Sequence, residues 1–165
     1  MMPKIAEKAQ VSKSVFMAGN ARPLQDLLVE QYEYLHSMDP AKVPAEAVQE
    51  VKKQVAFLNS PQFNLNSPAT ELPLGQPAPY WKYLKDYNQL KEVKKIKAPM
   101  FFAQGGRDYQ VTEKDFNLWK ETLKNDKTAV FKFYPTLSHL FIAGSGKPSP
   151  KDYETKGKVD EQFLK

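Results

Sequence analysis

Two polar side chains in the second half of the chain have the types and spacing of an acid–base pair. Asp108 stands in GGRDYQV, after the apolar segment 98–104, and His139 stands in YPTLSHLF, after the apolar segment 128–135. A carboxylate can hold an imidazole in one tautomer and stabilise its charged form, and the imidazole can then act as a general base toward a hydroxyl group. Asp108 and His139 are therefore the candidate catalytic residues.

Each of the two residues also has a simpler interpretation. Asp108 follows two glycines and precedes a predicted helix, where aspartate serves equally well as a turn residue and a cap. A single histidine in a loop is commonly exposed and without a role. The pair is more informative than either residue alone, because one strand–helix–strand unit separates them. The two strands should be neighbours, and their carboxyl ends should open on the rim where α/β sheets bind ligands.

The elements that must position this pair follow from the apolar pattern. Compact apolar runs predict strands at 14–19, 98–104 and 128–135. Between the last two, Thr112 and Asp115 have the spacing of a capping box at the start of a helix. Short connections between alternating strands and helices indicate a parallel sheet. The expected fold class is α/β, with about three parallel strands and flanking helices.

A helical segment separates the first predicted strand from the second. Leucines at helical spacing predict a helix over about 23–37, and apolar residues from Pro44 to Leu58 predict another that packs antiparallel to it. The interval 59–79 is rich in Pro, Asn and Ser and is typical of a loop. A short aromatic helix is expected over 79–88.

Composition excludes several classes of protein. The chain has 165 residues, of which 41% are hydrophobic, and its 10 Phe, 8 Tyr and 2 Trp exclude a disordered chain. No apolar run approaches a membrane span, and the N-terminus has no secretory h-region, so we expect a cytoplasmic protein without membrane contact. With 0 Cys and 2 His, neither thiolate chemistry nor a Cys- or His-rich metal site is expected. No metal and no organic cofactor are predicted.

The basic balance does not indicate a nucleic-acid partner. The formal net charge is +5, but lysine supplies nearly all of the positive charge, and Arg22 and Arg107 are the only arginines. Arginine is the residue that reads phosphates and bases through paired hydrogen bonds. We interpret the basic run KEVKKIK at 91–97 as a solvated approach to a strand, and we expect no nucleic-acid binding.

The segment from about 97 to 154 resembles the C-terminal part of an α/β-hydrolase of the serine esterase, dienelactone hydrolase and acyl-peptidase kind. The residues that carry the resemblance are KAPMFFAQGGRDYQV, FKFYPTLSHLF and GSGKPSPKDY, and residues 16–35 are similar to the strand and cap helix of such esterases. The resemblance implies that Asp108 is the acid and His139 the base of a catalytic triad. The implied substrate is a small-molecule ester, or less readily a peptide or thioester.

The same resemblance organises the rest of the chain. It implies a single domain over residues 1–165, a partial α/β-hydrolase fold, with a cap-like helical insertion at about 23–90. Tyr80 and Trp81 would then line an acyl pocket under the cap, although packing within a short helix explains them as well.

One departure from the family pattern is serious. The family places its nucleophile in a Gly-x-Ser-x-Gly elbow, and none of the eight serines in this sequence has that context. Residues 1–8 resemble the helix that follows the elbow, which implies that the serine, the oxyanion hole and the first strands precede Met1. We therefore expect the isolated chain to be inactive, because transition-state stabilisation is lost. We also expect self-association through the exposed strand at 14–19.

An alternative from another class stays open. A non-catalytic α/β interaction module would keep this scaffold without any chemistry. An upstream, in-frame Gly-x-Ser-x-Gly would favour the enzyme, and a natural start at Met1 would favour the module.

Overall fold

A computed structural model of the chain describes residues 1–154 and 156–164. The chain divides into two compact units, one formed by Met1–Ala21 together with Gln89–Lys165 and the other by Arg22–Asn88. The second unit coincides closely with the expected helical insertion at about 23–90. Its role as a cap stays a prediction.

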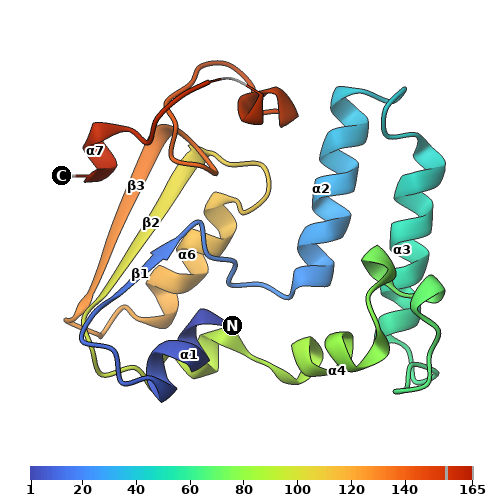
Figure 1. Cartoon of the computed structure of the whole chain (residues 1–165), viewed down its shortest axis with the longest axis horizontal. Coiled ribbons are helices and arrows are strands. Elements are labelled where there is room, and N and C mark those ends of the chain that lie inside the picture. The colour runs from blue at the N-terminus through green and yellow to red at the C-terminus, as the bar shows by residue number, and fades with distance from the viewer. Residues whose placement is uncertain (155, 165) are drawn as a thin grey trace. The chain divides into compact units, whose positions relative to one another are not determined.

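The first unit is an α/β unit built on a three-stranded parallel sheet in the order β1-β2-β3 (Figure 1). Its elements in chain order are α1 (Met2–Lys8), β1 (Ser14–Met17), α5 (Gln89–Val93), β2 (Met100–Arg107), α6 (Glu113–Thr122), β3 (Ala129–Ser138), the 3-10 helix η3 (Pro150–Tyr153) and α7 (Glu161–Leu164). The expected fold class, three parallel strands with flanking helices, is confirmed.

Aromatic rings form the core on one face of the sheet. Phe16, Phe102 and Phe131 are register partners on the three strands, and their rings stack at 4.5 and 5.0 Å between centroids. Phe116 and Trp119 of α6 pack onto this row. Helix α6 therefore covers this face because its apolar stripe meets three stacked rings.

The opposite face is covered only in part. Val15 of β1 and Val130 of β3 flank Phe101 in one register row, and both valines are exposed, as is Met17 in the next row. Strand β1 is an edge strand whose residues alternate between buried and exposed. An exposed edge is what the predicted self-association requires, and the oligomeric state itself stays a prediction.

Both strands that lead to the candidate site are longer than their apolar runs. Strand β2 continues through Gly105 and Gly106 to Arg107, and β3 continues past Pro135 to Ser138. Asp108 and His139 therefore follow the strand ends directly, and the glycines pair with β3 instead of closing β2.

The structure adds detail to two local expectations. The basic run at 91–97 begins in α5 and leads toward β2, with its lysines exposed and with Val93 and Ile96 buried in the core. Thr112 is the N-cap residue of α6 but makes no side-chain cap hydrogen bond. Asp115 accepts a hydrogen bond at 2.9 Å from the amide of Ala21, 94 residues away, so a tertiary contact also holds the start of α6.

The second unit is helical throughout. Helices α2 (Leu24–Met38) and α3 (Ala45–Asn59) lie side by side and run antiparallel, as expected (Figure 1). The segment after α3 is more ordered than a loop, because it forms the 3-10 helices η1 (Ala69–Glu71) and η2 (Pro73–Gly75) before α4 (Ala78–Asp86). The core of this unit consists of Leu28, Val51, Val55, Leu58, Leu72, Ala78 and Trp81.

Candidate functional site

A bulge between β2 and β3 brings the two candidate residues together. Gly105 is the register partner of Tyr134, yet Arg107 is the partner of Ser138, so three residues of β3 stand opposite the single residue Gly106. Because β3 gains two residues, the strands end together, and the next residue on each is Asp108 or His139.

The glycines make this bulge possible. A Cβ atom on Gly105 would lie 2.4 Å from the carbonyl oxygen of Leu137, and one on Gly106 would lie 2.6 Å from that of Pro135. Neither contact is sterically allowed, so only glycine lets the two backbones approach this closely. The motif Gly-Gly-Arg-Asp is therefore a close-packing device as well as a turn.

The carboxylate of Asp108 is completely buried and fully hydrogen-bonded. Its Oδ1 accepts hydrogen bonds from the backbone amides of Gln110 at 2.8 Å and Val111 at 3.0 Å. Its Oδ2 accepts from Nε2 of Gln104 at 3.1 Å and from Nδ1 of His139 at 2.8 Å. Four donors around one buried carboxyl group satisfy it and fix its orientation.

The imidazole of His139 lies between this carboxylate and solvent. Its side chain is 29% exposed, whereas that of Asp108 is 0% exposed. A carboxylate can only accept a hydrogen bond, so Nδ1 carries a proton, and in the neutral imidazole Nε2 keeps its lone pair. The arrangement is able to accept a proton at Nε2 while the buried carboxylate stabilises the resulting positive charge.

Gln104 is a site residue that the sequence analysis missed. It is 1% exposed on β2, and its Nε2 also donates to the carbonyls of Gly105 at 3.1 Å and Val111 at 2.8 Å. Every partner is an acceptor, so the amide nitrogen must face them. The available signal was a glutamine at the end of the apolar run APMFFAQ, where a buried polar group must have a partner.

A buried ion pair ties the segment after His139 to β2. Arg107 Nη2 contacts both carboxylate oxygens of Asp152, at 3.1 and 3.2 Å, and its Nε donates to the carbonyl of Gly146. Asp152 also completes a capping box with Ser149 at the start of η3. Ser149 therefore caps a short 3-10 turn.

Two tyrosines, Tyr109 and Tyr153, lie near the carboxylate of Asp108. Gln110 donates a hydrogen bond to the hydroxyl of Tyr153. Burial, reinforced by the charges of Tyr109, Asp108 and Asp152, raises the pKa of Tyr153 to about 12, and burial likewise raises the pKa of Tyr109. Both phenols are therefore neutral hydrogen-bonding groups at ordinary pH.

The two aromatic residues predicted to line a substrate pocket lie in the helical unit. Trp81 is completely buried in its core, and its indole Nε1 donates to the carbonyl of Pro73 at 3.1 Å. Tyr80 is half-buried and packs edge-on against Trp81. These contacts match the packing alternative, and a role in substrate binding stays a prediction for both.

The residues that the structure describes hold neither a candidate metal site nor a membrane-spanning helix. Over 1–154 and 156–164, no three acidic or histidine side chains come together in a way that could hold a metal ion. In the same residues, no helix has both the length and the apolar character needed to cross a bilayer.

Comparisons with known proteins match this chain to a family model and to a curated protein. The model of the dienelactone hydrolase family matches residues 68–164, more than half of the chain. Esterase EstD of Thermotoga maritima is 34% identical over 164 residues, which are 99% of this chain and 38% of that protein. The chain thus spans about two-fifths of the length of this curated relative.

Among solved structures, a Pyrococcus furiosus esterase, PF2001, matches 80% of this chain and 40% of its own at 14% identity. Its TM-score of 0.36 is too low to carry an argument about fold. The family match covers β2, the bulge, Asp108 and His139 in one continuous stretch. The three parallel strands and their flanking helices are accordingly a partial α/β-hydrolase fold, and the chain belongs to the dienelactone hydrolase family.

Proposed function

We propose that this chain supplies the acid and base of a serine-dependent carboxylic ester hydrolase. In this proposal Asp108 holds His139 in one tautomer, and His139 Nε2 takes the proton of a serine nucleophile and later activates water. The observation that carries the proposal is the 2.8 Å hydrogen bond between the completely buried Asp108 carboxylate and Nδ1 of His139.

The proposal needs a nucleophile that the 165 residues do not provide in the family's Gly-x-Ser-x-Gly context. Ser138 is next to His139 in sequence, but it is buried and its hydroxyl has no hydrogen-bond partner, so it is not engaged with the imidazole. We propose that the nucleophile comes from a segment outside these residues. The isolated chain would then lack both the attacking oxygen and the groups that stabilise a tetrahedral intermediate.

The substrate class follows from family membership and from the name of the relative. An ester is the proposed substrate because the relative is an esterase, and neutral Tyr109 and Tyr153 near the acid carry no charge that would demand a charged substrate. No step of this chemistry requires a metal or an organic cofactor, because the proton transfers use the imidazole alone.

A chimaera with Esterase EstD tests the proposal. The segment of that protein that the chain matches is replaced by this chain, and hydrolysis of p-nitrophenyl acetate is measured. The chimaera should be active, and His139→Ala should lower kcat/KM by several orders of magnitude. The matched control is His36→Ala, which removes the only other histidine and should leave the rate unchanged.

The isolated chain completes the test. It should hydrolyse the same ester no faster than its His139→Ala variant. A chimaera whose rate survives His139→Ala, or an isolated chain with triad-level turnover, would show that the proposed roles are wrong.

A further inference from the structure

His139 lies in a tight turn that closes on a strained residue. The turn, residues 138–141, is closed by a hydrogen bond at 3.0 Å from the amide of Phe141 to the carbonyl of Ser138. The amide of Ser138 donates in turn to the carbonyl of Ile142, also at 3.0 Å. Phe141 has φ +58°, in the left-handed region that bulky residues rarely adopt. Such a conformation persists only where the surrounding structure holds it.

The tip of this turn has little packing of its own. Leu140 is exposed, and the imidazole of His139 is held by its hydrogen bond to Asp108. Phe141, by contrast, is only 1% exposed. The position of His139 therefore depends on how firmly Phe141 is held.

The residues that hold Phe141 come from the C-terminal segment 156–164. The amide of Asp160 donates to the carbonyl of Phe141 at 2.9 Å. The ring of Phe163 lies 4.5 Å from that of Phe141, and both contact Tyr134 of β3. One backbone hydrogen bond and one ring contact thus fix the same residue from two directions.

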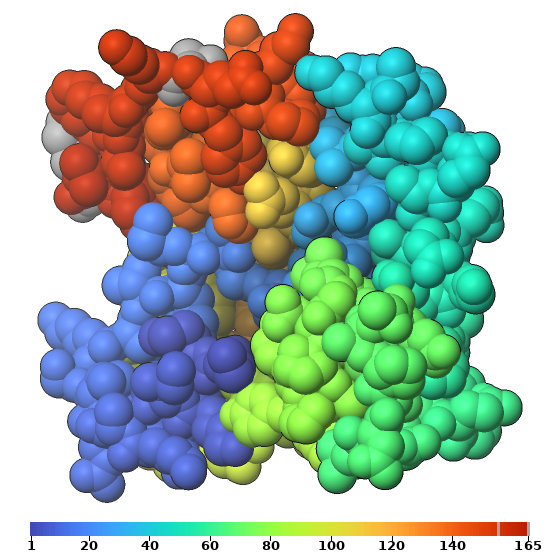
Figure 2. Space-filling view, turned by 45° about the vertical axis from the view of Figure 1, so that its right-hand side comes forward, coloured from blue at the N-terminus to red at the C-terminus, as the bar shows by residue number. Residues whose placement is uncertain are grey.

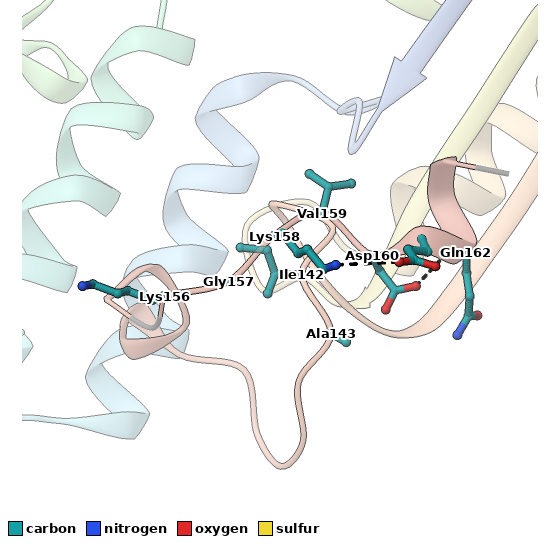
Figure 3. A pocket seen from close by; sticks show the side chains of 9 residues that line it. Ile142, Ala143, Lys156, Gly157, Lys158, Val159, Asp160 and Gln162 are labelled. Carbon is teal, nitrogen blue, oxygen red and sulfur yellow. Dashed lines mark hydrogen bonds and ion pairs between the residues drawn. The ribbon is translucent and has the colours of Figure 1, made fainter.

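The backbone of Gly157 in the C-terminal segment lies against the side chain of Ile142. A Cβ atom on Gly157 would lie 2.7 Å from Cγ2 of Ile142, so the C-terminal segment passes directly against the end of the turn. Ile142, Ala143, Val159 and Asp160 are among the residues that line a shallow cavity here (Figure 3), whose volume is about 570 Å³. Figure 2 shows the same C-terminal residues, in red, against the orange atoms of β3 and its turn.

We propose that Phe163 is a positioning residue for His139. The C-terminal segment keeps Phe141 in its left-handed conformation, this keeps the turn closed, and the closed turn presents Nδ1 of His139 to Asp108. The inference rests on the proposed function, because it assigns Phe163 a role only through the Asp108–His139 pair.

The test reads the tautomer of His139 directly. Ring ¹⁵N chemical shifts are measured at about pH 8, where an ordinary imidazole is neutral. The chain has 2 histidines, so His139→Ala assigns the signals and His36 serves as an internal reference. The unsubstituted chain should show a proton on Nδ1, and Asp108→Asn should move the signals toward the Nε2-protonated form that imidazole prefers in water.

Phe163→Ala should move the His139 signals at least half of the way to their positions in Asp108→Asn. Phe163→Tyr keeps the ring and should restore the original signals. Leu164→Ala is the matched control, because Leu164 is the exposed neighbour on the same helix and should change nothing. If Phe163→Ala does not fold, the ¹⁵N signals of His139 are measured in Phe163→Leu instead, and the same shift is expected.

The outcomes separate the two claims. If Asp108→Asn moves the His139 signals and a folded Phe163→Ala or Phe163→Leu protein leaves them unchanged, the inference is wrong and the proposed function stands. If Asp108→Asn itself leaves the signals unchanged, the proposed pairing is wrong, and the inference falls with it.

Discussion

Adding a methyl group at Gly105 is expected to separate the candidate pair without touching either residue. The new Cβ would lie 2.4 Å from the carbonyl oxygen of Leu137, and a separation of about 0.6 Å is needed to reach the 3.0 Å below which such contacts essentially never occur. The hydrogen bond between Asp108 and His139 spans 2.8 Å, and the same displacement along it would take it to about 3.4 Å, where little of it remains.

The energetic cost of this substitution has two parts. Overpacking a close contact costs about 1–3 kcal/mol, and losing a hydrogen bond to a charged group costs about 1.5–3 kcal/mol. Gly105→Ala should therefore lower the free energy of unfolding by about 3–5 kcal/mol, a large share of the stability of a typical domain. Urea unfolding followed by tryptophan fluorescence measures this loss.

The matched control is Gly19→Ala in the same unit. Its Cβ would meet its nearest neighbours at 3.8 Å, which is ordinary van der Waals contact, so the free energy of unfolding should change by less than about 0.5 kcal/mol. If Gly105→Ala is as stable as Gly19→Ala and keeps the Nδ1-protonated His139, the bulge does not position the pair as argued.

Three more predictions concern single side chains. Gln104→Leu should lower the free energy of unfolding by about 1–3 kcal/mol, because buried acceptors lose their donor, whereas Gln62→Leu at an exposed glutamine should be neutral in the same urea assay. Burial raises the pKa of Tyr153, so the protonated phenol stabilises the folded chain below pH ~10, and this contribution is lost as the pH rises toward 12. Absorbance titration should show a phenol that ionises at this high pH, and Tyr153→Phe should remove its signal. Trp81→Phe should destabilise the chain by about 1–3 kcal/mol through a void and a lost indole hydrogen bond, and a changed His139 tautomer in this variant would contradict a purely packing role.

The sequence located the two candidate residues because their neighbourhood follows from local rules. Apolar runs end just before both residues, and parallel strands joined by one helix must be neighbours. Neither inference requires knowledge of side-chain packing. Asp108 and His139 could therefore be placed on one rim, and the structure brings them within hydrogen-bonding distance.

The lengths of the strands could not be predicted in the same way. Gly105 and Gly106 read as terminators of a strand, since glycine breaks local structure, but close approach of β3 makes them strand residues. Asp115 likewise reads as a local cap, yet it also bonds to Ala21, far away in sequence. Tertiary contacts decide where a strand ends and which partner a polar side chain takes, and a short stretch of sequence does not reveal those contacts.

The left-handed conformation at Phe141 sets two requirements against each other at one position. Backbone preference alone would select glycine there, because glycine adopts a positive φ without steric cost. Glycine, however, has no ring to seat between Tyr134 and Phe163. The buried ring contributes more to stability than the relaxed backbone would, so Phe141→Gly should both destabilise the chain and release the turn that holds His139.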